Sequence, residues 1–64
     1  MINLLLLESD TVTFTFKGDL YRVTKNAGQV VMAQLSGNTY YRVPLVSEPG
    51  IALDDYLRAN GIVW

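Results

Sequence analysis

The sequence predicts a small, β-rich α+β protein: an antiparallel meander of four or five short strands followed by one C-terminal helix. Three observations predict this class. Apolar and polar residues alternate with a period of two between residues 11 and 17, as in a strand with one buried face. Turn-forming residues recur at short intervals after that stretch, and the pattern changes to a helical period after residue 47. A small curled sheet, an SH3-like barrel, or an open sheet with the helix across one face all fit this order.

Length and composition indicate a single domain, residues 1–64, with little room for a core. The chain begins at Met1, and half of its 64 residues are hydrophobic, so we expect a complete small reading frame. Cysteine and histidine are absent, which excludes disulfides and thiolate metal sites. A monomer of this size buries only about 60% of its unfolded surface. We therefore expect a homodimer or higher oligomer that buries the excess apolar surface between subunits.

The first predicted strand covers residues 2–7, INLLLL. This apolar run fits a strand buried on both faces or the start of a helix, and its period does not separate the two. Ile2 is β-branched, which favours a strand, and the polar residues 8–10 are typical of a turn. The sequence leaves open whether this strand pairs within the chain or across a dimer.

The clearest predicted strand covers residues 11–17. Its apolar residues alternate with threonine and lysine, and β-branched and aromatic types predominate, as is usual in strands. The apolar members are Val12, Phe14 and Phe16. They share one face, which we expect to be buried.

A hairpin is predicted to join this strand to a second strand over residues 20–25. Gly18 suits the first central position of a type II′ turn, so we expect the turn at Gly18–Asp19. Apolar side chains then meet across the hairpin, which supports the register. The predicted pairs are Phe16 with Tyr21 and Phe14 with Val23.

Two further turns and two further strands complete the meander. The turns are predicted at residues 26–28 and 36–38, and the strands at residues 29–35 and 39–45. Pro44 has no backbone N–H, so it must lie at the end of a strand or on an edge.

The residues from 47 to 61 are predicted to form one helix. Pro49 suits its first turn, and Gly61 suits a left-handed cap at its C-terminus. Two aspartates lie towards the helix start, where the dipole favours negative charge, and an arginine lies in the last turn. The charged residues concerned are Asp54, Asp55 and Arg58. An apolar stripe at helical spacing is formed by Leu53, Tyr56 and Leu57. The closing residues 62–64 are apolar and could pair with a sheet edge.

No pattern in the sequence predicts catalysis, a cofactor or a metal site. No histidine is present to act as a base for a serine nucleophile. Adjacent Asp54 and Asp55 diverge by about 100° on a helix, so they do not form a facing acid pair. The glycines carry no phosphate-binding or dinucleotide-binding fingerprint. We expect that the protein is not an enzyme and uses no cofactor.

Charge is unevenly distributed along the chain. Residues 11–46 carry a net charge of +3, whereas residues 1–10 and 47–64 each carry −2. Basic strands with exposed aromatic residues bind single strands in small β-barrels, so nucleic-acid binding is an alternative function. It would use Arg22, Tyr40 and Arg42. A pI near 4.9 is far below the value above about 9 that marks a typical nucleic-acid domain.

Tyr40 and Tyr41 are adjacent in a predicted strand and must point to opposite faces. Tyr41 shares its face with Val43, so we expect Tyr41 in the core. Tyr40 shares the other face with Arg42, and tyrosine and arginine are enriched in the energetic centres of protein interfaces. We therefore expect Tyr40 to be a contact residue.

The favoured hypothesis is a non-enzymatic protein-binding module, a regulator or inhibitor of a larger protein or complex, of the kind encoded by phages, prokaryotes and mobile elements. Its predicted partner-binding residues are Tyr40, Arg42, Arg22 and Trp64. Trp64 either covers the core or anchors a partner. A purely structural subunit of a larger assembly is a third possibility.

No membrane segment is predicted. The longest apolar run is far shorter than the ~20 residues of a membrane-spanning helix, and the N-terminus lacks the basic region of a signal peptide. We expect a cytoplasmic protein.

Overall fold

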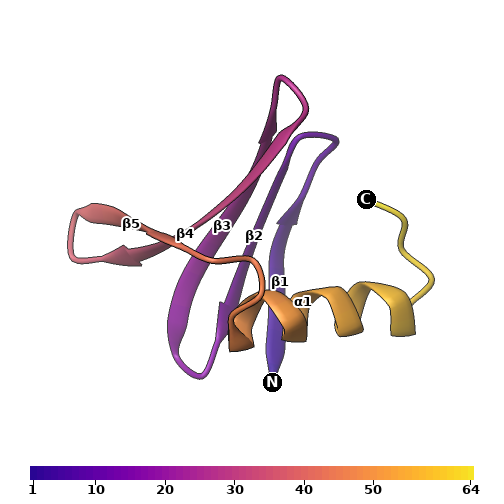
Figure 1. The fold of residues 1–64 in the computed structure, drawn as a ribbon. Coiled ribbons are helices and arrows are strands. Elements are labelled where there is room, and N and C mark those ends of the chain that lie inside the picture. The colour runs from indigo at the N-terminus through magenta and orange to yellow at the C-terminus, as the bar shows by residue number, and fades with distance from the viewer.

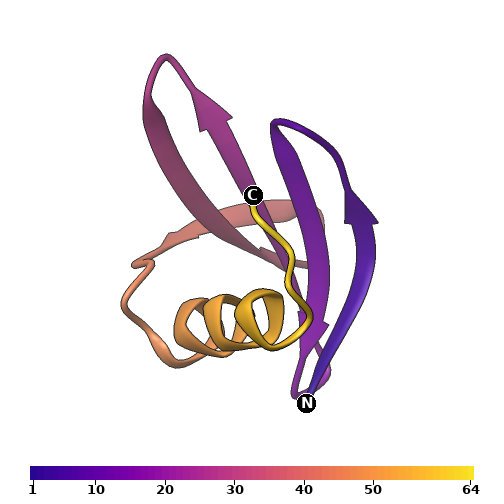
Figure 2. The ribbon, with the colours of Figure 1, turned by 90° about the vertical axis from the view of Figure 1, so that its right-hand side faces the viewer.

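The computed structural model describes all 64 residues and shows one antiparallel sheet with a helix across one face (Figures 1 and 2). The elements are β1 (Ile2–Leu7), β2 (Thr11–Phe16), β3 (Asp19–Asn26), β4 (Gln29–Ser36), β5 (Thr39–Val43) and α1 (Glu48–Ala59). The strand order is β1-β2-β3-β4-β5, so each strand pairs with its neighbours in sequence. The predicted meander and C-terminal helix are confirmed. The sheet is open, because β1 and β5 form its two edges and do not close a barrel.

The core lies between the sheet and α1. Alternate residues of β2 are fully or almost fully buried, as the period-two pattern predicts. Phe14 stacks on Tyr21 across the β2–β3 hairpin, with ring centroids 5.3 Å apart. The helix contributes two buried leucines. The buried set is Val12, Phe14, Phe16, Tyr21, Val23, Met32, Leu53 and Leu57.

The β2–β3 hairpin differs from its predicted register. The turn lies at Lys17–Gly18, one residue earlier than expected, and both residues have positive φ, 52° and 84°. Positive φ at both central positions is the mark of a type I′ turn, whose twist matches that of the flanking strands. Phe14 therefore lies opposite Tyr21, not opposite Val23. The predicted pairing was wrong by two residues, but an even shift keeps every side chain on its predicted face.

The other two predicted hairpin turns are present. Ala27 and Gly28 have φ of 51° and 79°, so this turn repeats the type I′ geometry. In the last turn Gly37 has a φ of 62°, and Asn38 is not among the residues with positive φ. A glycine with positive φ at the first central position fits type II′.

Strand β1 is present, but it is not buried on both faces. Ile2 and Leu4 pack against the core, whereas the remaining four residues of the strand are exposed. The register with β2 shifts between Leu4 and Leu6, which is a β-bulge with Leu5 as the extra residue. β1 pairs within the chain and leaves its other side open.

The expectation that Tyr41 lies in the core is wrong. Tyr41 is 58% exposed, although Val43, on the same face of β5, does pack against the core. Tyr41 lies opposite Gln34, towards the β4–β5 turn. That turn extends away from α1 (Figure 1), so the helix does not reach Tyr41.

The helix α1 is shorter than predicted, by one residue at its start and two at its end. Asp54 and Asp55 are the seventh and eighth of its twelve residues, so they lie in its middle and not towards its start as predicted, and Glu48 is the acidic residue of the first turn. Asp54 instead forms an ion pair with Arg58, one turn further on, at 3.1 Å.

The C-terminus of α1 has the predicted glycine cap. Gly61 takes a φ of 67°, and its amide donates to the carbonyl of Arg58 at 3.1 Å. The amide of Ile62 donates to the carbonyl of Leu57 at 2.9 Å. These two hydrogen bonds make a Schellman motif, which satisfies carbonyls that the helix leaves free.

No helix in the structure is long and apolar enough to cross a membrane.

Candidate binding surfaces

The sheet face opposite α1, here called the outer face, carries no acidic residue. Side chains alternate along each strand, so the residues that lie between core positions point to this face. The strand pairing brings them into rows across the sheet. The residues of β2 to β5 on the outer face are Thr11, Thr13, Thr15, Leu20, Arg22, Thr24, Asn26, Gln29, Val31, Ala33, Leu35, Tyr40 and Arg42.

Three of the four predicted partner-binding residues lie together on the outer face. Arg22 on β3 and Arg42 on β5 lie in one row, separated by Ala33 on β4. The guanidinium of Arg22 reaches across β4, and its carbon lies 4.0 Å from the ring centroid of Tyr40. Tyr40 is two residues from Arg42 on the same face. We call Arg22, Tyr40 and Arg42 the arginine–tyrosine patch.

Neither arginine of the patch has a carboxylate partner. The ion pairs in the structure join Lys17 to Glu48 and Arg58 to Asp54, and all four of those residues lie outside the patch. Stacking on Tyr40 restrains the Arg22 guanidinium and contributes about 0.5–1 kcal/mol at an exposed site, but it leaves the charge uncompensated. The patch therefore presents two positive charges to solvent on a face without negative ones.

An apolar row lies beside the patch. Leu20 and Leu35 are opposite each other on β3 and β4, and Leu35 is opposite Tyr40 on β5. Both leucines are half-buried, so they offer part of their apolar surface to a partner. Tyrosine and arginine are the residue types enriched in interface hot spots, and the two leucines add apolar contact area beside them.

Trp64 does not lie with the other three predicted residues. It is half-buried and packs against the core on the face that carries α1. Its indole N–H donates to the carbonyl of Glu8 at 2.6 Å, and the ammonium of Lys25 lies 4.1 Å from its ring centroid. Trp64 thus covers the core, as one of its two predicted roles requires. Residues 62–64 form no strand.

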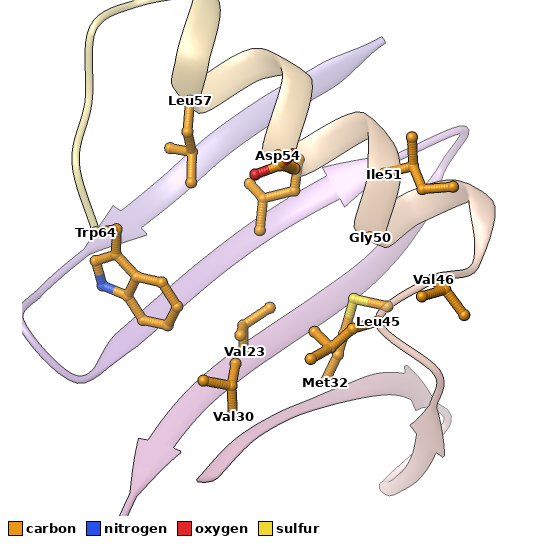
Figure 3. A pocket seen from close by; sticks show the side chains of 11 residues that line it. Val23, Val30, Met32, Leu45, Val46, Gly50, Ile51, Asp54, Leu57 and Trp64 are labelled. Carbon is orange, nitrogen blue, oxygen red and sulfur yellow. The ribbon is translucent and has the colours of Figure 1, made fainter. Parts of the chain in front are cut away.

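An apolar groove of about 370 Å³ opens beside Trp64, between α1 and the sheet (Figure 3). Val23, Val30 and Met32 form its floor, and Trp64 lies at one end. Three apolar residues around the start of α1 close the other end of the groove and stay exposed. The most exposed of them is Val46, at 82%. They are Leu45, Val46 and Ile51.

Sequence reasoning missed this groove. The strand predicted over residues 39–45 ends at Val43, because Pro44 cannot continue the ladder, so Leu45 and Val46 both lie in the connection to α1. Ile51 lies outside the stripe formed by Leu53 and Leu57. The sequence does contain one sign of the groove. Leu45 and Val46 are adjacent apolar residues in a connecting loop, and such loops usually run over the surface.

Tyr21 is a titratable residue of the core. Burial raises the pKa of the Tyr21 hydroxyl, and the negative charges of Asp19 and Glu48 raise it further. A raised pKa keeps the phenol protonated and therefore unsuited to act as a base. No group of three or more histidine, cysteine, aspartate or glutamate side chains is placed to hold a metal ion.

Comparison with protein-family models, with curated proteins and with solved structures finds no match to this chain.

Proposed function

We propose that this chain is a non-enzymatic protein-binding module that binds an acidic segment of a partner protein through the arginine–tyrosine patch. The single observation that supports this most is the pair of arginines without carboxylate partners, Arg22 and Arg42, on a face that has no acidic residue. Exposed charges of one sign favour partners of the other sign and speed their encounter.

The apolar row beside the patch favours a protein segment over a nucleic acid. Leu20 and Leu35 offer apolar contact next to the two cations, which suits a segment that combines acidic and apolar side chains. Single-strand binders instead need several open aromatic rings for base stacking. Tyr40 is the one aromatic residue on the outer face, and Arg22 already lies on its ring.

We further propose that the module acts as a homo-oligomer in the cytoplasm, as a regulator or inhibitor of a larger protein. Only nine of its 64 residues are buried, although half of the sequence is hydrophobic. Exposed apolar surface of this kind is typical of association. A reducing compartment agrees with the absence of cysteine.

The experiment that tests the binding proposal is a selection of peptides from a random 12-residue library on the immobilised protein. We expect enrichment of peptides that combine aspartate or glutamate with apolar residues. The Arg22→Gln/Arg42→Gln variant should bind the selected peptides at least about tenfold more weakly, because two charge-assisted contacts are lost.

Lys17→Gln/Arg58→Gln is the matched control, since it also removes two positive charges, and both residues lie away from the patch. It should bind the selected peptides like the wild type. Peptides without acidic enrichment, or equal binding to the double variant, would overturn the proposal.

A further inference from the structure

Strand β1 leaves one whole side unpaired. It pairs with β2 alone and forms an edge of the sheet. In an antiparallel pair the backbone groups of alternate residues point away from the partner, so a six-residue strand leaves about three N–H and three C=O groups free. Such an edge is a template for pairing with another strand.

The β1 edge lacks most of the features that normally protect an edge strand. Its residues, INLLLL, include no charged residue and no proline. The bulge at Leu5 is the one protective feature it has, and the residues on either side of it stay extended. The opposite edge is different: β5 is one residue shorter, contains Arg42 and is followed by Pro44. Charge, proline and short length all discourage edge pairing.

The exposed side chains of β1 are mostly apolar. Leu5 is 55% exposed, and Leu6 and Leu7 are each 41% exposed. Apolar side chains on a free edge make the edge self-complementary, because a second copy offers both the hydrogen-bonding groups and the apolar contacts that the first one lacks.

We infer that β1 pairs antiparallel with β1 of a second copy, so that two five-stranded sheets join into one continuous sheet. Antiparallel pairing of identical strands has a twofold axis, which closes the assembly at two chains. This inference rests on the self-association part of the proposed function and names its interface. The arginine–tyrosine patch reaches β5, at the far edge of each sheet, so each patch stays open in the dimer.

The test is the molar mass in solution, measured by light scattering on the full chain at about 50 µM. We expect twice 7.2 kDa for the wild type. In the Asn3→Lys/Leu6→Lys variant, both changes fall on exposed β1 residues, and like charges meet across the twofold axis. This variant should run as a monomer and keep its circular dichroism spectrum.

The matched control is Thr39→Lys/Tyr41→Lys, which adds the same charge to exposed residues of β5 and should remain a dimer. Hydrogen exchange gives a second readout: amides of β1 should become more protected as the protein concentration rises, while amides of β5 should not. A monomeric wild type would overturn both the inference and the proposed self-association. A dimer that survives the β1 changes would overturn the β1 interface alone, whether or not the β5 changes disrupt it. Peptide binding by the patch is measured separately and does not depend on either result.

Discussion

The guanidinium of Arg22 lies against the ring of Tyr40, with 4.0 Å between the guanidinium carbon and the ring centroid, although β4 separates their strands. The contact holds a cation against an aromatic ring on the outer face, between β3 and the edge strand β5. Arg42 lies beside them, and neither arginine has a carboxylate partner. The contact therefore fixes the position of the Arg22 charge without neutralising it, and the surface stays positively charged.

Tyr40→Ala should leave the fold intact and weaken binding of the selected acidic peptides. Tyr40 is 40% exposed and lies outside the core, so its removal opens no cavity there, and the lost cation–π contact is worth about 0.5–1 kcal/mol. Thermal unfolding and peptide titration measure the two effects. Tyr41→Ala, at a more exposed residue on the other face, is the control for binding. A large fall in melting temperature for Tyr40→Ala would show that Tyr40 is a structural residue.

Phe14→Ala should unfold the protein or cost about 3–5 kcal/mol of stability, because it truncates a fully buried ring. The same change removes the stacking contact with Tyr21. Urea denaturation followed by circular dichroism measures the cost. An unchanged unfolding midpoint would contradict the position of Phe14 at the centre of the core.

Gly50→Ala should destabilise the protein, although alanine in a helix is normally favoured over glycine by about 1 kcal/mol. A Cβ atom on Gly50 would overlap the backbone carbonyl of Leu45 and come within 2.8 Å of its carbon. The chain would have to move where residues 44–47 turn into α1. Asp55→Ala, at an exposed helical position, should not destabilise the protein and serves as the control. A higher melting temperature for Gly50→Ala would show that the backbones of Gly50 and Leu45 are further apart than described.

Stability should fall as the pH rises above about 10 in a way that depends on Tyr21. Burial raises the pKa of Tyr21 in the folded protein above its ordinary value of 10.0. As the pH rises, the unfolded chain therefore loses the Tyr21 proton before the folded protein does. The stabilisation that protonated Tyr21 gives to the folded state is fully present below pH 10.0 and is lost as the pH rises through the folded pKa.

Denaturation between pH 8 and about 11.5 measures this loss. Tyr21→Phe should remove part of the alkaline loss, whereas Tyr41→Phe, which changes an exposed phenol, should not. Identical alkaline profiles for the wild type and Tyr21→Phe would exclude Tyr21 as the source.

A labelled single-stranded DNA of mixed sequence should not bind measurably at 50 mM salt, and fluorescence anisotropy tests this. If Arg22 and Arg42 each met a phosphate, log affinity would fall against log salt with a slope of about −1.4, or about sevenfold between 50 and 200 mM. Binding with that slope, lost in Arg22→Gln/Arg42→Gln, would favour the nucleic-acid alternative over an acidic protein partner.

The sequence predicted the elements well because their signals are local. The alternation around Phe14 predicted β2 and its buried face, and Gly61 predicted the end of α1. The face shared by Tyr40 and Arg42 also follows from local alternation. The partnership of Tyr40 with Arg22 does not, because it needs the order of strands and the length of a side chain that crosses β4.

The register of the hairpin and the burial of residues beneath α1 were harder to predict. Lys17 takes a positive φ, which non-glycine residues adopt only occasionally, so the sequence favoured a turn that began at Gly18. Tyr41 has the alternation of a core residue, but its burial depends on how far α1 extends over β5 (Figure 1). Neither the twist of a hairpin nor the reach of a helix can be read from a single strand.

The hydrogen bond from Trp64 to Glu8 joins residues 56 positions apart, whereas the sheet is built from neighbours in sequence. Hairpins close over short loops, and proteins rich in local contacts fold quickly. Joining the two ends of the chain closes a much larger loop and carries a higher entropic cost. We therefore expect the fluorescence of the chain's single tryptophan to report on a non-local step of folding that follows the pairing of the hairpins.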